Sequence, residues 1–141
     1  MKKDRQTDIM GLPIVVVVAE QHPILRTSLA ALLSHDGYRV FQAEDLNATL
    51  SCINRIRDLA VLLADLDMPG WKSIVQHALD TAPDAFVVAM AGVERIPEIS
   101  ALNQHGVQMC LEKPLILRMF ARRLVKSSDD EMRRDCRGHW R

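Results

Sequence analysis

Five short apolar runs, each followed by a segment with helical periodicity, constrain the fold of this chain more than any other feature. The first run, residues 14–18, is β-branched throughout, which is typical of a strand buried on both faces of a parallel sheet. The later runs cover residues 39–43, 59–64, 85–91 and 107–111. Strands that alternate with helices predict an α/β domain, a doubly wound sheet of five parallel strands with helices on both faces.

The segments between these runs carry helix signals. Pro23 suits a first helical turn, Gly37 can end that helix in the left-handed conformation, and Asp45 can cap the second helix. We expect further helices over residues 72–81 and 96–105. Apolar stripes at helical spacing support the first, second and last helices: Leu25, Leu29, Leu32 and Leu33; Leu46, Leu50, Ile53 and Ile56; Leu117, Phe120, Ala121 and Leu124.

Composition indicates an ordinary globular protein rather than a disordered or membrane-spanning one. The chain has 141 residues, of which 48% are apolar and 26% charged, values that suit one domain with a real core. Its net charge is zero, so charge gives no case for binding nucleic acid or a membrane. Cys52, Cys110 and Cys136 show no CxxC spacing, which favours a reducing, cytoplasmic compartment over a disulfide framework.

Charge and apolar content divide the chain into three parts. We expect residues 1–12 to be a flexible N-terminal segment, residues 13–126 to form the folded domain and residues 127–141 to be a charged C-terminal tail. From residue 118 to residue 141 there are eight Lys and Arg against four Asp and Glu. Because the net charge of the chain is zero, residues 1–117 carry an equal surplus of negative charge.

Three of the expected strands end in residues that could hold a metal ion and a phosphoryl group. Glu20 and Gln21 follow the first run, Asp65 and Asp67 follow the third, and Lys113 follows the fifth. The carboxyl ends of parallel strands meet at one edge of the sheet, where ligands of such folds bind. We therefore expect Glu20, Asp65 and Lys113 to converge there. No Gly-rich phosphate loop and no GxSxG elbow occurs, which disfavours a nucleotide enzyme or a hydrolase.

These residues lie in motifs that resemble the receiver domain of two-component response regulators. The motifs are His22-Pro23-Ile24-Leu25-Arg26, then Asp65 with Met68-Pro69-Gly70 behind it, then Lys113-Pro114. The resemblance runs from about Ile14 to Val125. It implies a flavodoxin-like fold with strand order 2-1-3-4-5. It also implies a signalling module rather than an enzyme, in which Asp65 accepts a phosphoryl group from a histidine kinase or phosphotransfer protein and Lys113 contacts that group.

The same resemblance implies a Mg²⁺ site, but this sequence departs from the family's pattern. Glu20 and Gln21 stand where the family usually has two acidic residues. The implied ligands are Glu20, Asp65 and the backbone carbonyl of Asp67, with Gln21 as a weak or water-mediated contact. Two carboxylates then face the metal in place of three, although the Asp67 side chain could restore part of the charge. Because Mg²⁺ gives up water reluctantly, we expect weaker Mg²⁺ binding.

Two positions that couple phosphorylation to a change of surface in the family are altered here. Ala91 ends the fourth run where the family has Thr or Ser, and Cys110 occupies a position that is commonly Tyr or Phe. Alanine has no donor for a phosphoryl oxygen. The resemblance therefore implies a receiver in which the usual switch is weakened.

Arg118, Arg122 and Lys126 form a positive row at i,i+4 spacing on the expected last helix. It is either a solvated face or a docking surface for a protein partner or a second copy. We hypothesise an atypical receiver in phosphorelay signalling, with weak Mg²⁺-dependent phosphorylation at Asp65, that acts through protein–protein interaction. Two alternatives stay open: a fully phosphorylation-dependent stand-alone receiver, and the regulatory domain of a nucleic-acid-binding regulator whose output domain is absent here.

Overall fold

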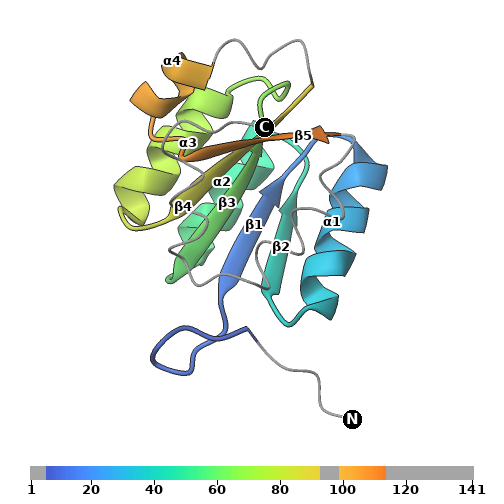
Figure 1. The fold of residues 1–141 in the computed structure, drawn as a ribbon, viewed down its shortest axis with the longest axis vertical. Coiled ribbons are helices and arrows are strands. Elements are labelled where there is room, and N and C mark those ends of the chain that lie inside the picture. The colour runs from blue at the N-terminus through green and yellow to red at the C-terminus, as the bar shows by residue number, and fades with distance from the viewer. Residues whose placement is uncertain (1–5, 93–98, 114–141) are drawn as a thin grey trace.

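The structure is a computed structural model that describes residues 6–92 and 99–113. Within these ranges strands and helices alternate along the chain (Figure 1): β1 (Val15–Ala19), α1 (Pro23–His35), β2 (Arg39–Ala43), α2 (Leu46–Arg55), β3 (Leu59–Asp65), α3 (Trp71–Thr81), β4 (Phe86–Ala91), α4 (Ile99–Gln104) and β5 (Met109–Glu112). The expected last helix, with Leu117, Phe120, Ala121 and Leu124, lies outside the described residues. So do residues 93–98, where the fourth helix was expected to begin.

The five strands form one parallel sheet in the order β2-β1-β3-β4-β5, which confirms the expected doubly wound, flavodoxin-like α/β fold. β1 pairs with β2 on one side and with β3 on the other. α1 packs on one face of the sheet, whereas α2, α3 and α4 pack on the other (Figure 1). The strand order reverses between β1 and β3, so the carboxyl ends of these two strands mark the expected ligand-binding edge.

The core consists of two apolar layers, one on each face of the sheet. Val17, Leu62 and Ile74 belong to one layer, and Val16 and Leu63 belong to the other. Successive strand side chains point to opposite faces, which explains why a continuous β-branched run suits β1. Burying each side chain of this size contributes about 1.5–3 kcal/mol.

Helix boundaries follow the signals in the sequence. Pro23 opens α1, Gly37 lies beyond its end with a φ of 99°, and Asp45 Oδ1 accepts a hydrogen bond from the Ala48 N–H at 2.8 Å. One residue of the expected apolar stripe of α1 is not buried: Leu32 is 37% exposed. No helix in the described part of the chain has both the length and the apolar character needed to cross a membrane.

Residues 6–13 form a hydrogen-bonded loop before β1. Thr7 and Pro13 make an antiparallel bridge, and Asp8 Oδ1 accepts from the Met10 and Leu12 N–H groups at 2.9 Å each. The Gln6 N–H donates to the Gly37 carbonyl at 3.2 Å, which ties this loop to the turn before β2. The division of the chain at residues 12 and 126 stays a prediction.

Candidate functional site at the carboxyl edge of the sheet

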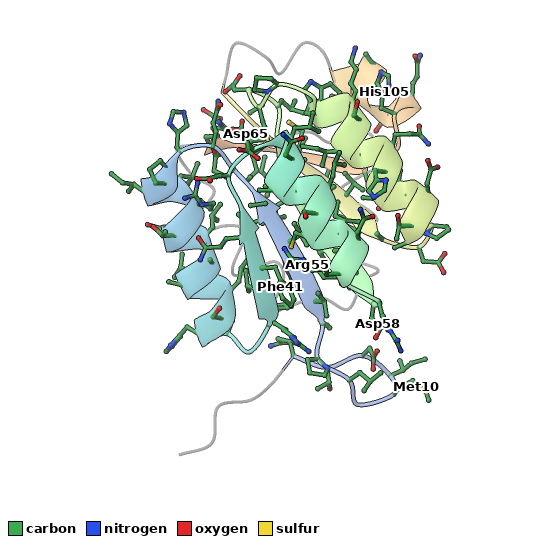
Figure 2. All side chains as sticks on the ribbon, turned by 180° about the vertical axis from the view of Figure 1, so that it is seen from behind. Met10, Phe41, Arg55, Asp58, Asp65 and His105 are labelled. Atoms are coloured by element: carbon green, nitrogen blue, oxygen red, sulfur yellow. The ribbon has the colours of Figure 1, made fainter. Side chains whose placement is uncertain are left out.

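The carboxyl ends of β1, β3 and β5 bring Glu20, Asp65 and Lys113 together, as expected from the sequence. Lys113 Nζ lies 2.7 Å from Asp65 Oδ1, 3.2 Å from Asp67 Oδ2 and 3.4 Å from Glu20 Oε1. The ammonium group is therefore surrounded by three carboxylates. Figure 2 shows Asp65 at one end of the sheet, far from Met10 in the loop at the other end.

Asp65 is buried, with 1% exposure, and its carboxylate is oriented by backbone donors. Oδ1 accepts from the Asp67 N–H at 2.8 Å, and Oδ2 has a longer contact of 3.5 Å from the Gln21 N–H. Burial opposes ionisation of Asp65. The neighbouring Glu20 side chain, the Lys113 ammonium group and the Asp67 N–H together outweigh burial and lower the pKa of Asp65 below its ordinary value. Asp65 is therefore a carboxylate anion at neutral pH.

Glu20 is fully buried, and its two carboxylate oxygens have different surroundings. Oε2 accepts from the His22 N–H at 3.0 Å, whereas Oε1 has no hydrogen-bond partner and only the ionic contact with Lys113. Burial and the neighbouring Asp65 carboxylate raise the pKa of Glu20. A buried oxygen that lacks a hydrogen bond calls for a further donor or a cation.

Lys113 is the positive charge at the centre of the site. Burial opposes its charged form, but the contacts with Asp65, Glu20 and Asp67 outweigh burial and raise the pKa of Lys113 above its ordinary value. Lys113 therefore stays an ammonium cation across the physiological range. It contacts the Asp67 carboxylate as well, which the sequence indicated only as a charge that could supplement the metal ligands.

Gln21 joins the loops that follow β1 and β3. Its Nε2 donates a hydrogen bond to the backbone carbonyl of Asp67 at 3.2 Å. A carbonyl can only accept, so the amide nitrogen of Gln21 must face it. This carbonyl is the one that the family resemblance assigns to the metal, which means that Gln21 contacts a candidate ligand. The sequence showed only that Gln21 replaces an acidic residue of the family. It did not indicate that Gln21 would contact the Asp67 carbonyl.

The oxygens at this edge fit a hard divalent cation such as Mg²⁺. Glu20 Oε1, the Asp65 carboxylate and the Asp67 carbonyl are the ligand types that Mg²⁺ prefers. A carbonyl oxygen carries two lone pairs, and the hydrogen bond from Gln21 uses one of them. In residues 6–92 and 99–113, no three His, Cys, Asp or Glu side chains are grouped so as to hold a metal ion. The nearby carboxylates converge on Lys113 Nζ instead, so a metal here would rely partly on the carbonyl.

Ala91 and Cys110 lie on neighbouring strands next to this edge. Ala91 ends β4 with no exposed surface, and Cys110 is buried in β5 opposite Ala89. Burial raises the pKa of the Cys110 thiol to about 11, so it is neutral at pH 7. Ala91 therefore lacks the hydroxyl, and Cys110 the aromatic ring, that the family commonly has at these positions.

A further contact at the site, made by Arg26, was not predicted from the sequence. Arg26 Nη1 donates to the backbone carbonyl of Glu20 at 3.0 Å, which ties the first turn of α1 to the end of β1. Pro23 marks the start of α1 in the sequence, so Arg26 could be placed in the first helical turn, close to the end of β1. That position was the available signal for this contact. Arg118, Arg122 and Lys126, expected to form an interaction surface, lie outside the described residues.

Solved structures share this fold at low sequence identity. A CheY-like receiver domain protein from Methanospirillum hungatei JF-1 is 17% identical with a TM-score of 0.73, covering 87% of this chain and 98% of that chain. A response regulator from Burkholderia pseudomallei, solved with a phosphorylated aspartic acid, a calcium ion and citrate, is 19% identical with a TM-score of 0.72, covering 86% and 72%. A chain from the crystal structure of the P1 domain of CheA3 in complex with CheY6 from R. sphaeroides is 21% identical with a TM-score of 0.60. The match covers 72% of this chain and 82% of that chain.

The sequence itself supports a more specific assignment. A search of curated proteins finds no match. The family model of the response regulator receiver domain, however, matches residues 16–124, which cover the five strands apart from Val15 and include the acidic edge. This chain therefore belongs to the response regulator receiver domain family.

Proposed function

We propose that this chain is an atypical receiver in two-component phosphorelay signalling, with Asp65 as its phosphoacceptor and Lys113 as the contact of the phosphoryl group. The supporting observation is the 2.7 Å ion pair between Lys113 Nζ and Asp65 Oδ1 at the carboxyl end of β3. It holds a buried carboxylate in its anionic, nucleophilic form beside a cation. Membership of the receiver family supports the same assignment.

In the proposed reaction Asp65 Oδ2 attacks the phosphorus of a phosphohistidine on a histidine kinase or phosphotransfer protein. A bond forms between Oδ2 and phosphorus, the phosphorus–nitrogen bond breaks, and the imidazole leaves with the electron pair. Oδ2 suits this role because its backbone contact, from the Gln21 N–H, is 3.5 Å long, whereas Oδ1 is held by two shorter contacts. The complex of the CheA3 P1 domain with CheY6 supports a partner of this type.

Glu20, Asp65 and the Asp67 carbonyl are the proposed Mg²⁺ ligands. When bound, Mg²⁺ neutralises charge on the phosphoryl oxygens. Gln21 brings no charge to this set and contacts the carbonyl, so we propose weaker Mg²⁺ affinity and slower phosphorylation than a site with a third carboxylate would give. Lys113 supplies part of the positive charge from the chain itself.

The output of this receiver is proposed to be protein–protein interaction rather than a strong phosphorylation switch. Ala91 and Cys110 lack the groups that would respond to a phosphoryl group, and both are buried. The positive row of Arg118, Arg122 and Lys126 is the proposed surface for a partner or a second copy. We place the protein in the cytoplasm with its kinase, where thiols stay reduced.

The competing function is a fully phosphorylation-dependent stand-alone receiver. The observation in its favour is the complete ion-pair cluster around Lys113, which keeps Asp65 anionic. The two functions differ in whether phosphorylation changes the surface, and the prediction for Ala91 below separates them.

Phosphorylation of Asp65 is tested by mass spectrometry of the intact chain after incubation with acetyl phosphate and Mg²⁺. The parent should gain one phosphoryl group, and Asp65→Asn should gain none. Asp84→Asn, which changes an exposed aspartate in the loop before β4, is the matched control and should gain one. If Asp65→Asn is modified as readily as the parent, or if the parent is not modified at any Mg²⁺ concentration, the proposed role of Asp65 is wrong.

A further inference from the structure

A groove runs along α2 and the edge strand β2, on a side of the molecule that the proposed phosphorylation chemistry does not use. It consists of two adjoining hollows of about 280 Å³ and 570 Å³ that share Phe41, Arg55 and Ile56. Figure 2 labels Phe41, Arg55 and Asp58 along this side, away from Asp65. The two hollows adjoin along α2 and β2, which suits an extended ligand.

Positive charge dominates the lining of this groove. Arg39, Arg55 and Arg57 line it against a single acid, Asp58. All ion pairs found among the described residues belong to Lys113, so none of these three guanidinium groups is neutralised by a carboxylate in that part of the chain. The Arg55 Nε–H donates to the Ser51 carbonyl at 3.4 Å, which holds that side chain along α2.

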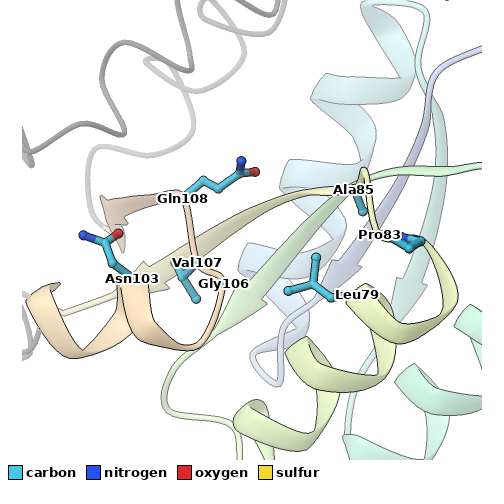
Figure 3. Close-up of a pocket in the computed structure, with 7 residues that line it drawn as sticks. All are labelled: Leu79, Pro83, Ala85, Asn103, Gly106, Val107 and Gln108. Carbon is cyan, nitrogen blue, oxygen red and sulfur yellow. The ribbon is translucent and has the colours of Figure 1, made fainter.

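A second hollow, on another side of the molecule, has no charged lining. It measures about 380 Å³ and lies between the end of α3 and the turn before β5 (Figure 3). None of its seven lining residues is charged. Its one long polar side chain near the sheet, Gln108, already accepts from the Val87 N–H at 3.3 Å. Of these hollows in the described part of the chain, the pair beside β2 is therefore the better suited to a charged ligand.

The backbone of β2 offers unpaired groups beside the arginines. β2 is an edge strand that pairs with β1 alone. The Arg39 N–H donates to the Ile14 carbonyl, and the Ala43 carbonyl accepts from the Glu20 N–H. Because backbone groups alternate in direction along a strand, those of Val40 and Gln42 point away from β1. In the described ranges no other strand pairs with them, and such an edge can accept an extended segment.

We propose that this surface binds an extended acidic segment of a partner protein, which adds to the sheet beside β2. Its backbone would pair with Val40 and Gln42, and its acidic side chains on the α2 face would contact Arg39, Arg55 and Arg57. Side chains of an added strand alternate between faces, so the segment recognised best has acidic residues at every second position. This inference is independent of phosphorylation at Asp65.

A single-stranded nucleic acid is also an anionic chain, but it fits this surface less well. Bases bind such grooves by stacking on exposed aromatic rings. Phe41 is the one aromatic residue that lines the groove, and the Arg39 guanidinium already covers its ring at 5.4 Å from the centroid. The outward backbone groups of β2 match a peptide backbone, and they have no counterpart in a nucleic acid.

The test measures fluorescence anisotropy of a labelled peptide of alternating glutamate and valine, titrated with the full chain. The parent should bind it saturably and more weakly as salt rises. Arg55→Glu/Arg57→Glu should weaken binding at least about tenfold, which equals about 1.4 kcal/mol. Lys72→Glu, a single charge reversal at an exposed position on α3, is the control for charge outside the groove and should bind like the parent.

Changes in the probe separate strand addition from simple charge attraction without altering the protein. Two further peptides carry N-methyl groups on every second backbone nitrogen, one on the glutamates and the other on the valines. Both keep the charge, but only one of them loses the N–H groups that would pair with β2. That peptide should bind at least about tenfold more weakly. A lysine–valine peptide should not bind. Circular dichroism of each variant confirms folding. The proposal would be overturned by any of three results: equal binding by the parent and the double arginine variant, undiminished binding of both N-methylated peptides, or tighter binding of oligothymidylate.

Discussion

The side-chain amide of Gln21 donates a hydrogen bond to the backbone carbonyl of Asp67 at 3.2 Å, which links the loops after β1 and β3. A carboxylate at position 21 could not make this bond, because it has no hydrogen to donate. Gln21 therefore has two effects on the proposed metal site. It removes a negative charge, and it contacts one of the candidate ligands.

Gln21→Asp should tighten Mg²⁺ binding. The change adds one negative charge next to a divalent cation, a gain of about 1 kcal/mol or more on the Coulomb estimate at high effective dielectric. It also removes the hydrogen bond from residue 21 to the Asp67 carbonyl. Isothermal titration with Mg²⁺ measures it. Gln104→Asp, at an exposed position on α4, is the control and should change affinity little. Equal affinities for the parent and Gln21→Asp would mean that position 21 does not face the metal.

Glu20→Gln should change how stability depends on pH. The pKa of Glu20 is raised in the folded protein, so as pH rises the unfolded chain loses this proton first. Above the ordinary glutamate pKa of about 4.3, stability therefore falls until the folded pKa is passed. Glutamine removes that decline, and at neutral pH the variant should be at least as stable as the parent.

Urea unfolding of both proteins from about pH 4 to pH 8 measures this difference. Glu44→Gln, which changes an exposed glutamate in the loop after β2, should follow the pH profile of the parent. A parallel pair of profiles for the parent and Glu20→Gln would show that Glu20 titrates normally.

The fold and the meeting of the site residues could be predicted because they depend on periodicity and topology. A β-branched run such as residues 14–18 has few alternatives to a buried strand, and parallel strands place their carboxyl ends at one edge. Glu20, Asp65 and Lys113 were therefore expected together. The partner of Gln21 could not be predicted in the same way, because it depends on the backbone path of two loops.

Packing also limits what a periodic pattern can show. Leu32 continues the apolar stripe of α1, yet it is 37% exposed, because a stripe marks which way a helix faces but not how much of that face the sheet covers. The groove beside β2 had no signal in the sequence at all. Arg39 and Arg55 are sixteen positions apart and line the same groove because α2 packs beside the edge strand.

Ala91→Thr should restore a response to phosphorylation. A ligand shifts a conformational equilibrium only by contacts that differ between the two states, and alanine offers the phosphoryl group no hydrogen bond. Amide spectra with and without a beryllofluoride mimic at Asp65 should change little between Ser100 and Val125 in the parent and more in Ala91→Thr. Ala31→Thr, at an exposed position on α1, should behave like the parent. Large changes in the parent would favour the fully phosphorylation-dependent receiver.

Arg118→Glu/Arg122→Glu should weaken self-association or partner binding, whereas Asp65→Asn should not. A positive row steers and orients association with an acidic surface, so binding should also fall as salt rises. Sedimentation equilibrium of the parent and each variant measures the effect, and Arg133→Glu/Arg134→Glu, in the C-terminal tail, is the matched control. Because Ala91 and Cys110 leave a phosphoryl group with few switch contacts, association should not require phosphate. If Asp65→Asn abolishes association while the double charge reversal leaves it intact, phosphorylation rather than the positive row controls the interaction.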